Sequence, residues 1–229
     1  MLGDTLQKPK KSNKSETTRS LILATALRLF RERGFEETTM RLIADEAGTS
    51  LGNAYYYFRS KDELIHSFYA SLQIEQLAAC EGILAVEKSL RGRLAGIIRA
   101  QLGIMTPYHR LFMSLFKIAA DPTNTLNPFS EDTREVRNAS IHRFSDAVGG
   151  ANERITDDLK EELPMLLWLY HMGIVLFWIY DRSSGFVRTY KLIELSSDLI
   201  CNLITMASLP LLAPLRKSAL QLVVSLREI

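Results

Sequence analysis

The 229-residue sequence predicts an all-α protein in which a small N-terminal helical domain is joined to a larger helical domain. Apolar residues recur at the spacing of one helix face, and no stretch alternates long enough to predict a strand. With 47% hydrophobic residues, a chain of this length can bury a full core, and its length suits one medium and one small domain.

Residues 1–16 are rich in lysine, serine and asparagine and hold too little apolar surface to pack, so we expect a mobile basic arm. Two interpretations stay open: a solubilising tail, or an arm that touches phosphates. The segment lacks the apolar stretch of a secretory signal, and the two cysteines form no disulfide framework. A cytoplasmic location is therefore expected.

The first predicted helix starts at Thr17 and ends at Gly34, where a left-handed residue closes a helix. Phe35 should fold back on Phe30, the contact that commonly accompanies this ending. One face of this helix is apolar, formed by Ile22, Leu23, Ala26, Leu27 and Phe30.

The stretch 38–62 predicts two short helices around a tight turn. Thr38 or Thr39 caps the first helix, Gly48 ends it, and Thr49 or Ser50 caps the second. The second helix contains Gly52, Asn53 and three consecutive tyrosines, an unfavourable composition for a helix chosen only for stability.

A different requirement explains these residues. A helix that enters the major groove of DNA needs a small residue near a phosphate, short polar groups at its N-terminal end, and hydroxyls further along. Residues 50–57 supply them in that order, whereas Phe58 should be core. Residues 1–61 hold 11 Lys and Arg against 7 Asp and Glu, so positive charge gathers at this end.

The ordered motifs Ala44-Asp45-Glu46-Ala47-Gly48-Thr49-Ser50, Gly52, Tyr55-Tyr56-Tyr57-Phe58 and Ser60-Lys61-Asp62-Glu63-Leu64 resemble the DNA-binding domain of the tetracycline-repressor (TetR) family. The resemblance covers residues 17–69 and implies a helix-turn-helix domain. It departs from the common form at Ala54 and Tyr56, which leaves the base preference unreadable. The residues that it implies contact DNA are Thr38, Thr39, Thr49, Ser50, Gly52, Asn53, Tyr55, Tyr56, Tyr57 and Lys61.

Ser60 and Glu63 have the spacing of a capping box and open a helix that we expect to reach about Glu87. A loop is predicted at 121–128, where Asp, Pro, Thr and Asn cluster. Further helices are expected over 91–106, 107–120, 130–148, 156–181 and 186–207, with a last amphipathic helix after Pro210 and Pro214.

The apolar block 163–180 has no formal charge and allows two interpretations. It is near the lower length limit of a membrane span, which is one alternative. Pro164, His171 and Gly173 within it, acidic residues at its ends and the lack of a flanking positive cluster favour a buried helix. The resemblance implies that the last long helices of the 70–229 domain form a four-helix bundle with a second subunit, without a membrane.

The larger domain should also hold an effector pocket, because the resemblance implies a ligand-responsive protein. Aromatic and sulfur-bearing residues are the candidates for its lining, although most are expected to be ordinary core. They are Tyr108, Phe112, Met113, Phe116, Phe144, Trp168, His171 and Met172. The four histidines lack metal spacing, Cys80 and Cys201 should be core residues, and no metal or cofactor is expected.

The resemblance thus implies a transcriptional regulator, most often a repressor, that acts as a homodimer on a palindromic double-stranded operator and is released by a small apolar or aromatic effector. The alternatives are a helical small-molecule-binding protein without regulatory DNA binding, and a membrane protein built on 163–180. No serine elbow, phosphate loop or paired catalytic carboxylates support an enzyme.

Overall fold

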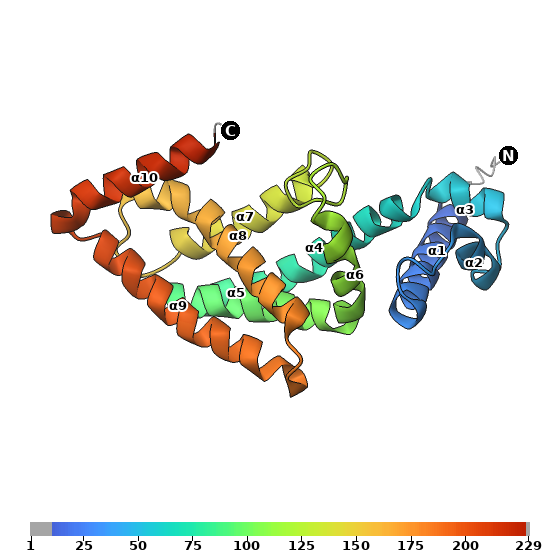
Figure 1. Ribbon diagram of the computed structural model, residues 1–229, viewed down its shortest axis with the longest axis horizontal. Coiled ribbons are helices and arrows are strands. Elements are labelled where there is room, and N and C mark those ends of the chain that lie inside the picture. Colours follow the sequence, from blue (N-terminus) through green and yellow to red (C-terminus); the bar gives the residue numbers. More distant parts are fainter. Residues whose placement is uncertain (1–10, 228–229) are drawn as a thin grey trace, which may run out of the picture. The chain divides into compact units, whose positions relative to one another are not determined.

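The computed structural model describes residues 11–227, with side chains for residues 15–225, and these residues form helices, turns and loops without a strand (Figure 1). The α-helices are α1 (Lys11–Arg33), α2 (Met40–Glu46), α3 (Leu51–Tyr57), α4 (Lys61–Val86), α5 (Leu90–Met105), α6 (His109–Ala119), α7 (Arg134–Gly149), α8 (Asp157–Tyr180), α9 (Val187–Ala207) and α10 (Ala213–Arg227). Short 3-10 turns lie at η1 (Thr106–Tyr108), η2 (Ser184–Phe186) and η3 (Pro210–Leu212).

Several predicted helix starts need correction: α7 begins at Arg134 rather than at about Ser130, and α10 begins at Ala213, before Pro214. Helix α1 begins at Lys11 rather than Thr17, so the last residues of the expected arm are helical, whereas residues 1–10 lie outside the described part of the chain. The helix predicted from Pro107 is divided into η1 and α6, because Pro107 sits in the short 3-10 turn.

The chain divides into two compact units, and one segment of the expected larger domain groups with the first unit. The first unit contains Met1–Tyr69 and also Arg110–Asn127, a segment that the sequence assigns to the larger domain. Ring contacts explain the difference, because Phe112 of α6 lies 6.1 Å from Phe68 and 6.4 Å from Tyr69, centroid to centroid. The second unit contains Ala70–His109 and Pro128–Ile229.

Tight turns in the first unit adopt the predicted backbone. Gly34 has a φ of 94° and Gly48 a φ of 64°, both in the left-handed region that glycine tolerates. The Phe35 ring folds back to 5.1 Å from Phe30, as predicted. Both rings are buried, and Phe58 after α3 is buried beneath the Arg19 guanidinium of α1.

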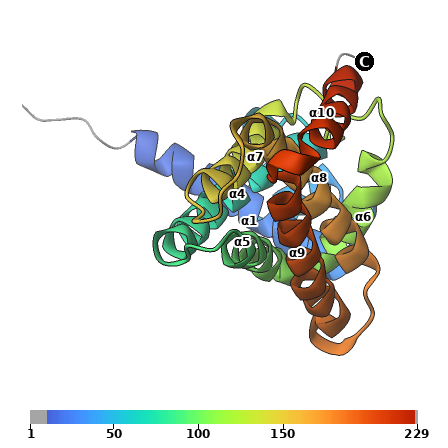
Figure 2. The ribbon, with the colours of Figure 1, turned by 90° about the vertical axis from the view of Figure 1, so that its left-hand side faces the viewer.

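The second unit is built around α8, which packs against α7, α9 and α10 (Figure 1). Helix α5 packs on α7 and α9, and the end-on view shows α5 beside α9 (Figure 2). Both cysteines are buried here, Cys80 at 1% and Cys201 at 8% exposure, as expected for core residues.

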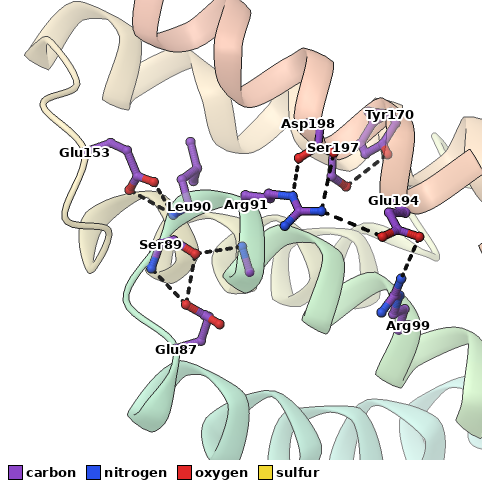
Figure 3. A network of polar contacts seen from close by, with 11 residues as sticks. Glu87, Ser89, Leu90, Arg91, Arg99, Glu153, Tyr170, Glu194, Ser197 and Asp198 are labelled. Carbon is purple, nitrogen blue, oxygen red and sulfur yellow. Dashed lines mark hydrogen bonds and ion pairs between the residues drawn. The ribbon is translucent and has the colours of Figure 1, made fainter.

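Polar contacts fix α5 to the neighbouring segments (Figure 3). The Leu90 backbone N–H at the start of α5 donates to the Glu153 carboxylate at 2.8 Å and 2.9 Å. The next residue, Arg91, pairs with Asp198 and reaches Glu194 at 3.9 Å, both on α9. The pairs with Arg91 are half exposed, so they orient α9 more than they stabilise it.

Helix α8 contains the apolar block and is long and apolar enough to cross a membrane, with a mean hydropathy of 1.6 over a window of 18 residues. Half of that apolar window is buried inside the protein. Leu163, Leu167, Trp168, Ile174 and Trp178 point into the second unit, each at 5% exposure or less. A core helix has this composition, so the hydropathy of α8 has an explanation within the fold.

The connection from α8 to α9 depends on the carboxylate of Asp181. One of its oxygens accepts from the Ser183 backbone N–H at 2.8 Å and hydroxyl at 2.6 Å, and the other from the Thr189 backbone N–H at 2.9 Å and hydroxyl at 2.7 Å. Burial alone would raise the pKa of Asp181, but these four bonds outweigh it and lower the pKa to about 2.

A lowered pKa predicts that the stabilisation from Asp181 is present above its ordinary pKa of 3.8 and is lost as the pH falls towards about 2. We expect Asp181→Asn to lower the free energy of unfolding at pH 7 by roughly 1–3 kcal/mol, because an amide cannot accept all four bonds. Urea denaturation should show the gap from wild type closing between pH 4 and pH 2. The exposed Asp132→Asn is the control, and a gap that stays constant down to pH 2 would contradict the role of Asp181.

Candidate nucleic-acid interface

Side-chain hydroxyls cap the N-termini of α2 and α3, the two short helices of the first unit. The Thr39 hydroxyl accepts from the Leu42 backbone N–H at 3.2 Å at the start of α2. The Ser50 hydroxyl accepts from the Asn53 backbone N–H at 3.1 Å at the start of α3. These caps place both hydroxyls at helix N-termini, where backbone N–H groups and the helix dipole attract an anion.

Thr38 does not share this position. Its side chain is fully buried, and its hydroxyl donates to the Gly34 carbonyl at 2.7 Å. The expectation that Thr38 meets DNA is therefore corrected: this hydroxyl closes the turn after α1, and the exposed Thr39 is the cap.

Helix α3 divides its side chains between core and surface. Ala54 and Phe58, four residues apart, are fully buried. Tyr55 is 46% exposed and Tyr56 is 79% exposed, so their hydroxyl-bearing rings stand on the outer side. This confirms that the tyrosine triplet cannot all face one core. Gly52 has open space where a side chain would begin.

Tyr57 is half-buried and contacts α1. Its hydroxyl lies 3.2 Å from the Ser15 hydroxyl on α1, and its ring meets that of Tyr56 edge-on at 5.1 Å. The triplet thus separates into two surface tyrosines and one that anchors α3 to α1.

Asn53 and Thr49 are joined by a side-chain bond. The Asn53 amide nitrogen donates to the Thr49 hydroxyl at 2.7 Å, and both side chains are half-buried. The bond holds the Asn53 side chain in one orientation, which lowers the entropy cost of any contact that this amide makes.

Lys61, the first residue of α4, has a defined position on the surface of the first unit. Its ammonium donates to the Phe35 carbonyl at 2.7 Å and lies 4.3 Å from the centre of the Phe35 ring. The hydrogen bond uses one of its three N–H groups. The Lys61 head therefore has a defined position and retains donors.

Lys61 lines an open depression on the first unit together with Thr38, Thr39, Met40, Tyr55, Arg59, Ser60 and Asp62. Arg59 is exposed there and was not among the predicted residues, although a cation between Phe58 and the Ser60 cap is visible in the sequence. Ser60 accepts from the Glu63 N–H as predicted, but Glu63 bonds back to the Arg59 N–H, not to Ser60.

The predicted effector residues do not all fall in one unit. Phe112, Met113 and Phe116 belong to the first unit, whereas the other five belong to the second. In the second unit Phe144 lies 5.7 Å from His171, while Trp168 meets Phe129 at 5.4 Å. Tyr108 and Met172 are half-buried. The predicted pocket thus stays a prediction. Within residues 11–227 no three His, Cys, Asp or Glu side chains gather as a metal site would require.

Sequence comparisons match this architecture. Residues 22–68 match the family described as "Bacterial regulatory proteins, tetR family", and residues 93–220 match "Tetracyclin repressor-like, C-terminal domain". The HTH-type transcriptional repressor KstR2 of Mycobacterium tuberculosis is 31% identical over 91 residues, which are 40% of this chain and 46% of that protein. Across the curated relatives, the matched part spans between 23% and 49% of their length.

Solved structures share the fold. A TetR transcriptional regulator from Nitrosomonas europaea has a TM-score of 0.63 at 19% identity, covering 79% of this chain and 96% of that one. Thermus thermophilus FadR, a TetR-family repressor solved with lauroyl-CoA, has a TM-score of 0.54 at 20% identity, covering 76% of this chain and 92% of that one. Because the C-terminal family model alone matches more than half of the sequence, this chain belongs to the tetracycline-repressor family of bacterial regulatory proteins.

Proposed function

We propose that this protein is a DNA-binding transcriptional repressor that acts as a homodimer in the cytoplasm and is released from its operator by a small-molecule effector. The outward face of α3 is the observation that carries the proposal. It presents Ser50, the fixed Asn53, Tyr55 and Tyr56 while Ala54 and Phe58 hold the helix in the core. The name of the relative KstR2 as a repressor supports the direction of regulation.

The groups of this face suit different parts of a duplex. Ser50 and Asn53 stand at the start of α3, where a recognition helix meets base edges. The hydroxyls of Thr39, Tyr55 and Tyr56 and the remaining Lys61 donors suit phosphate oxygens, which position the protein without reading sequence. Thr49 and Gly52 complete the surface, since Gly52 leaves room for a close backbone approach.

A dimer is supported by exposed apolar residues on two neighbouring helices of the second unit. Leu195, Leu199, Leu203 and Met206 recur on one face of α9, each more than half exposed. Leu169, Leu176 and Phe177 of the adjacent α8 are each at least 40% exposed. Apolar patches of this kind mark contact surfaces, and a second copy would bury them as a four-helix bundle. A two-fold axis then sets two α3 helices on half-sites about 34–36 Å apart.

The effector is the less defined part of the proposal. The solved complex of the structural neighbour FadR with lauroyl-CoA supports a ligand with an apolar portion. An effector shifts the protein only by binding the DNA-free arrangement more tightly than the DNA-bound one.

The roles on α3 predict different responses to substitution. Tyr55→Phe should weaken binding roughly threefold to tenfold on every duplex, because it removes one phosphate hydrogen bond. Asn53→Ala should weaken binding to the operator more than binding to other duplexes, and so lower the ratio of the affinity for the operator to the affinity for random DNA. Fluorescence anisotropy at fixed salt, with a duplex selected from a random library and its scrambled version, measures both. Tyr57→Phe is the matched control, since its hydroxyl already meets Ser15.

Two results would contradict this assignment. An equal loss on both duplexes from Asn53→Ala would remove its role in base recognition. A wild-type protein that binds no selected duplex would overturn the proposed function itself.

The dimer surface predicts that a charge at its centre separates the subunits. Leu199→Glu should give a monomer in sedimentation velocity and lower operator affinity by at least about tenfold, because one half-site contact is lost. Val86→Glu is the control, a substitution at an aliphatic residue that is 82% exposed outside the patch. A Leu199→Glu protein that sediments as a dimer would show that α9 is not the subunit interface.

A further inference from the structure

The second unit buries an arginine that has only neutral partners. Arg143 of α7 is 3% exposed. Its Nη1 donates to Gln73 at 2.6 Å, and its Nη2 donates to Gln76 at 3.2 Å and to the Ser140 hydroxyl at 2.8 Å. Within the described residues no aspartate or glutamate pairs with this guanidinium.

Gln101 of α5 and His171 of α8 complete the cluster around Arg143. The Gln101 amide is assigned the orientation in which its oxygen accepts from Arg143 Nε at 3.0 Å and Nη2 at 3.2 Å and its nitrogen donates to His171 Nε2 at 3.1 Å. The opposite orientation would face its N–H groups towards the guanidinium. Four helices, α4, α5, α7 and α8, thus direct polar side chains to one point.

His171 carries an unused donor on the side of its ring that faces away from Gln101. Burial, and then the nearby Arg143, lower the pKa of His171 to about 3, so the ring is neutral at physiological pH. Because Nε2 accepts from Gln101, the proton lies on Nδ1. His171 is 6% exposed and its Nδ1 is buried without a hydrogen-bond partner. Buried donors are nearly always paired, so this one calls for an acceptor.

A second buried arginine shows what a purely structural role looks like. Arg93 of α5 is 5% exposed and donates to four backbone carbonyls: Leu84, Glu87, Asp146 and Ala147, at 2.8–3.1 Å. These carbonyls lie at the C-terminal ends of α4 and α7, where helices leave acceptors unpaired and favour a cation. Arg93 is therefore explained by the helix ends, whereas Arg143 meets side chains that can turn away.

We propose that the Arg143 cluster binds the carboxylate of the effector, so that the effector is an apolar monoanion. The proposal rests on the proposed function, because it names the chemistry that the effector-binding unit recognises. An isolated buried cation is unfavourable, and a carboxylate accepts two parallel N–H bonds from a guanidinium. The amides of Gln73 and Gln76 can rotate and donate to the same carboxylate.

The charge of the cluster decides between anions. One guanidinium with neutral glutamines and a neutral histidine balances a single negative charge. A phosphate dianion would leave a second charge buried without a partner, which is costly. Phe144 is fully buried against His171, so the surroundings suit an apolar remainder.

Matched pairs of a carboxylate and its amide test the inference while the natural effector is still unidentified. The probes are octanoate, 4-phenylbutyrate and 2-naphthoate, each with its primary amide, and titration calorimetry measures binding to the full-length protein. We expect at least one carboxylate to bind about tenfold or more tightly than its amide, because only the anion gains charge-assisted bonds. Arg143→Met should abolish this preference, and Arg143→Lys should retain part of it.

Arg93→Met is the control, since it removes another buried guanidinium but should leave the preference for the carboxylate unchanged. The comparison of each carboxylate with its amide in the wild type needs no variant and decides the matter if Arg143→Met fails to fold. Absence of binding by all three carboxylates at about 1 mM, equal binding of acids and amides, or a preference that survives in Arg143→Met overturns the inference. Operator binding by the same samples is measured separately, so failure of the anion site is distinguishable from failure of the proposed function.

Discussion

The side chains that the first unit exposes on α3 are determined by two buried residues, Ala54 within the helix and Phe58 at its C-terminal cap. Ala54 and Phe58 are four residues apart and fully buried, which fixes the rotation of a helix only two turns long. Once this side faces the core, Tyr55 and Tyr56 can only face outward. The tight endings at Gly34 and Gly48 hold α1 and α2 against the same core. A small apolar contact thus determines which polar groups are presented.

The second unit shows two ways in which a helical protein accommodates a buried cation. Arg93 serves the backbone, since the C-terminal ends of two helices leave carbonyls that need donors. Arg143 serves side chains, and the amides and hydroxyl around it have no net charge. The first arrangement is complete as it stands. The second keeps a positive charge in the core with partners that can rearrange, a property suited to a binding site.

Helix α8 combines two demands that account for its unusual composition. Trp168 and Trp178 are buried inside the unit, whereas Leu176 and Phe177 remain exposed on another side. A helix that contributes to its own core and also presents an apolar contact surface must be hydrophobic nearly all round. For this reason composition alone could not distinguish a membrane span from a buried helix at 163–180. The burial or exposure of each side chain was needed to explain the hydropathy of this block.

The sequence by itself determined the all-α class, the helix order and the helix-turn-helix segment, because apolar periodicity, caps and glycine endings are local properties of neighbouring residues. It also identified the short polar residues of α3. Only the tertiary structure decided that Thr38 is buried while Thr39 is the cap, that Tyr57 meets α1, and that Arg110–Asn127 groups with the first unit. The neutral surroundings of Arg143 likewise arise from α4, α5 and α7 meeting at one point. Such contacts join residues far apart in the chain, and no local pattern records them.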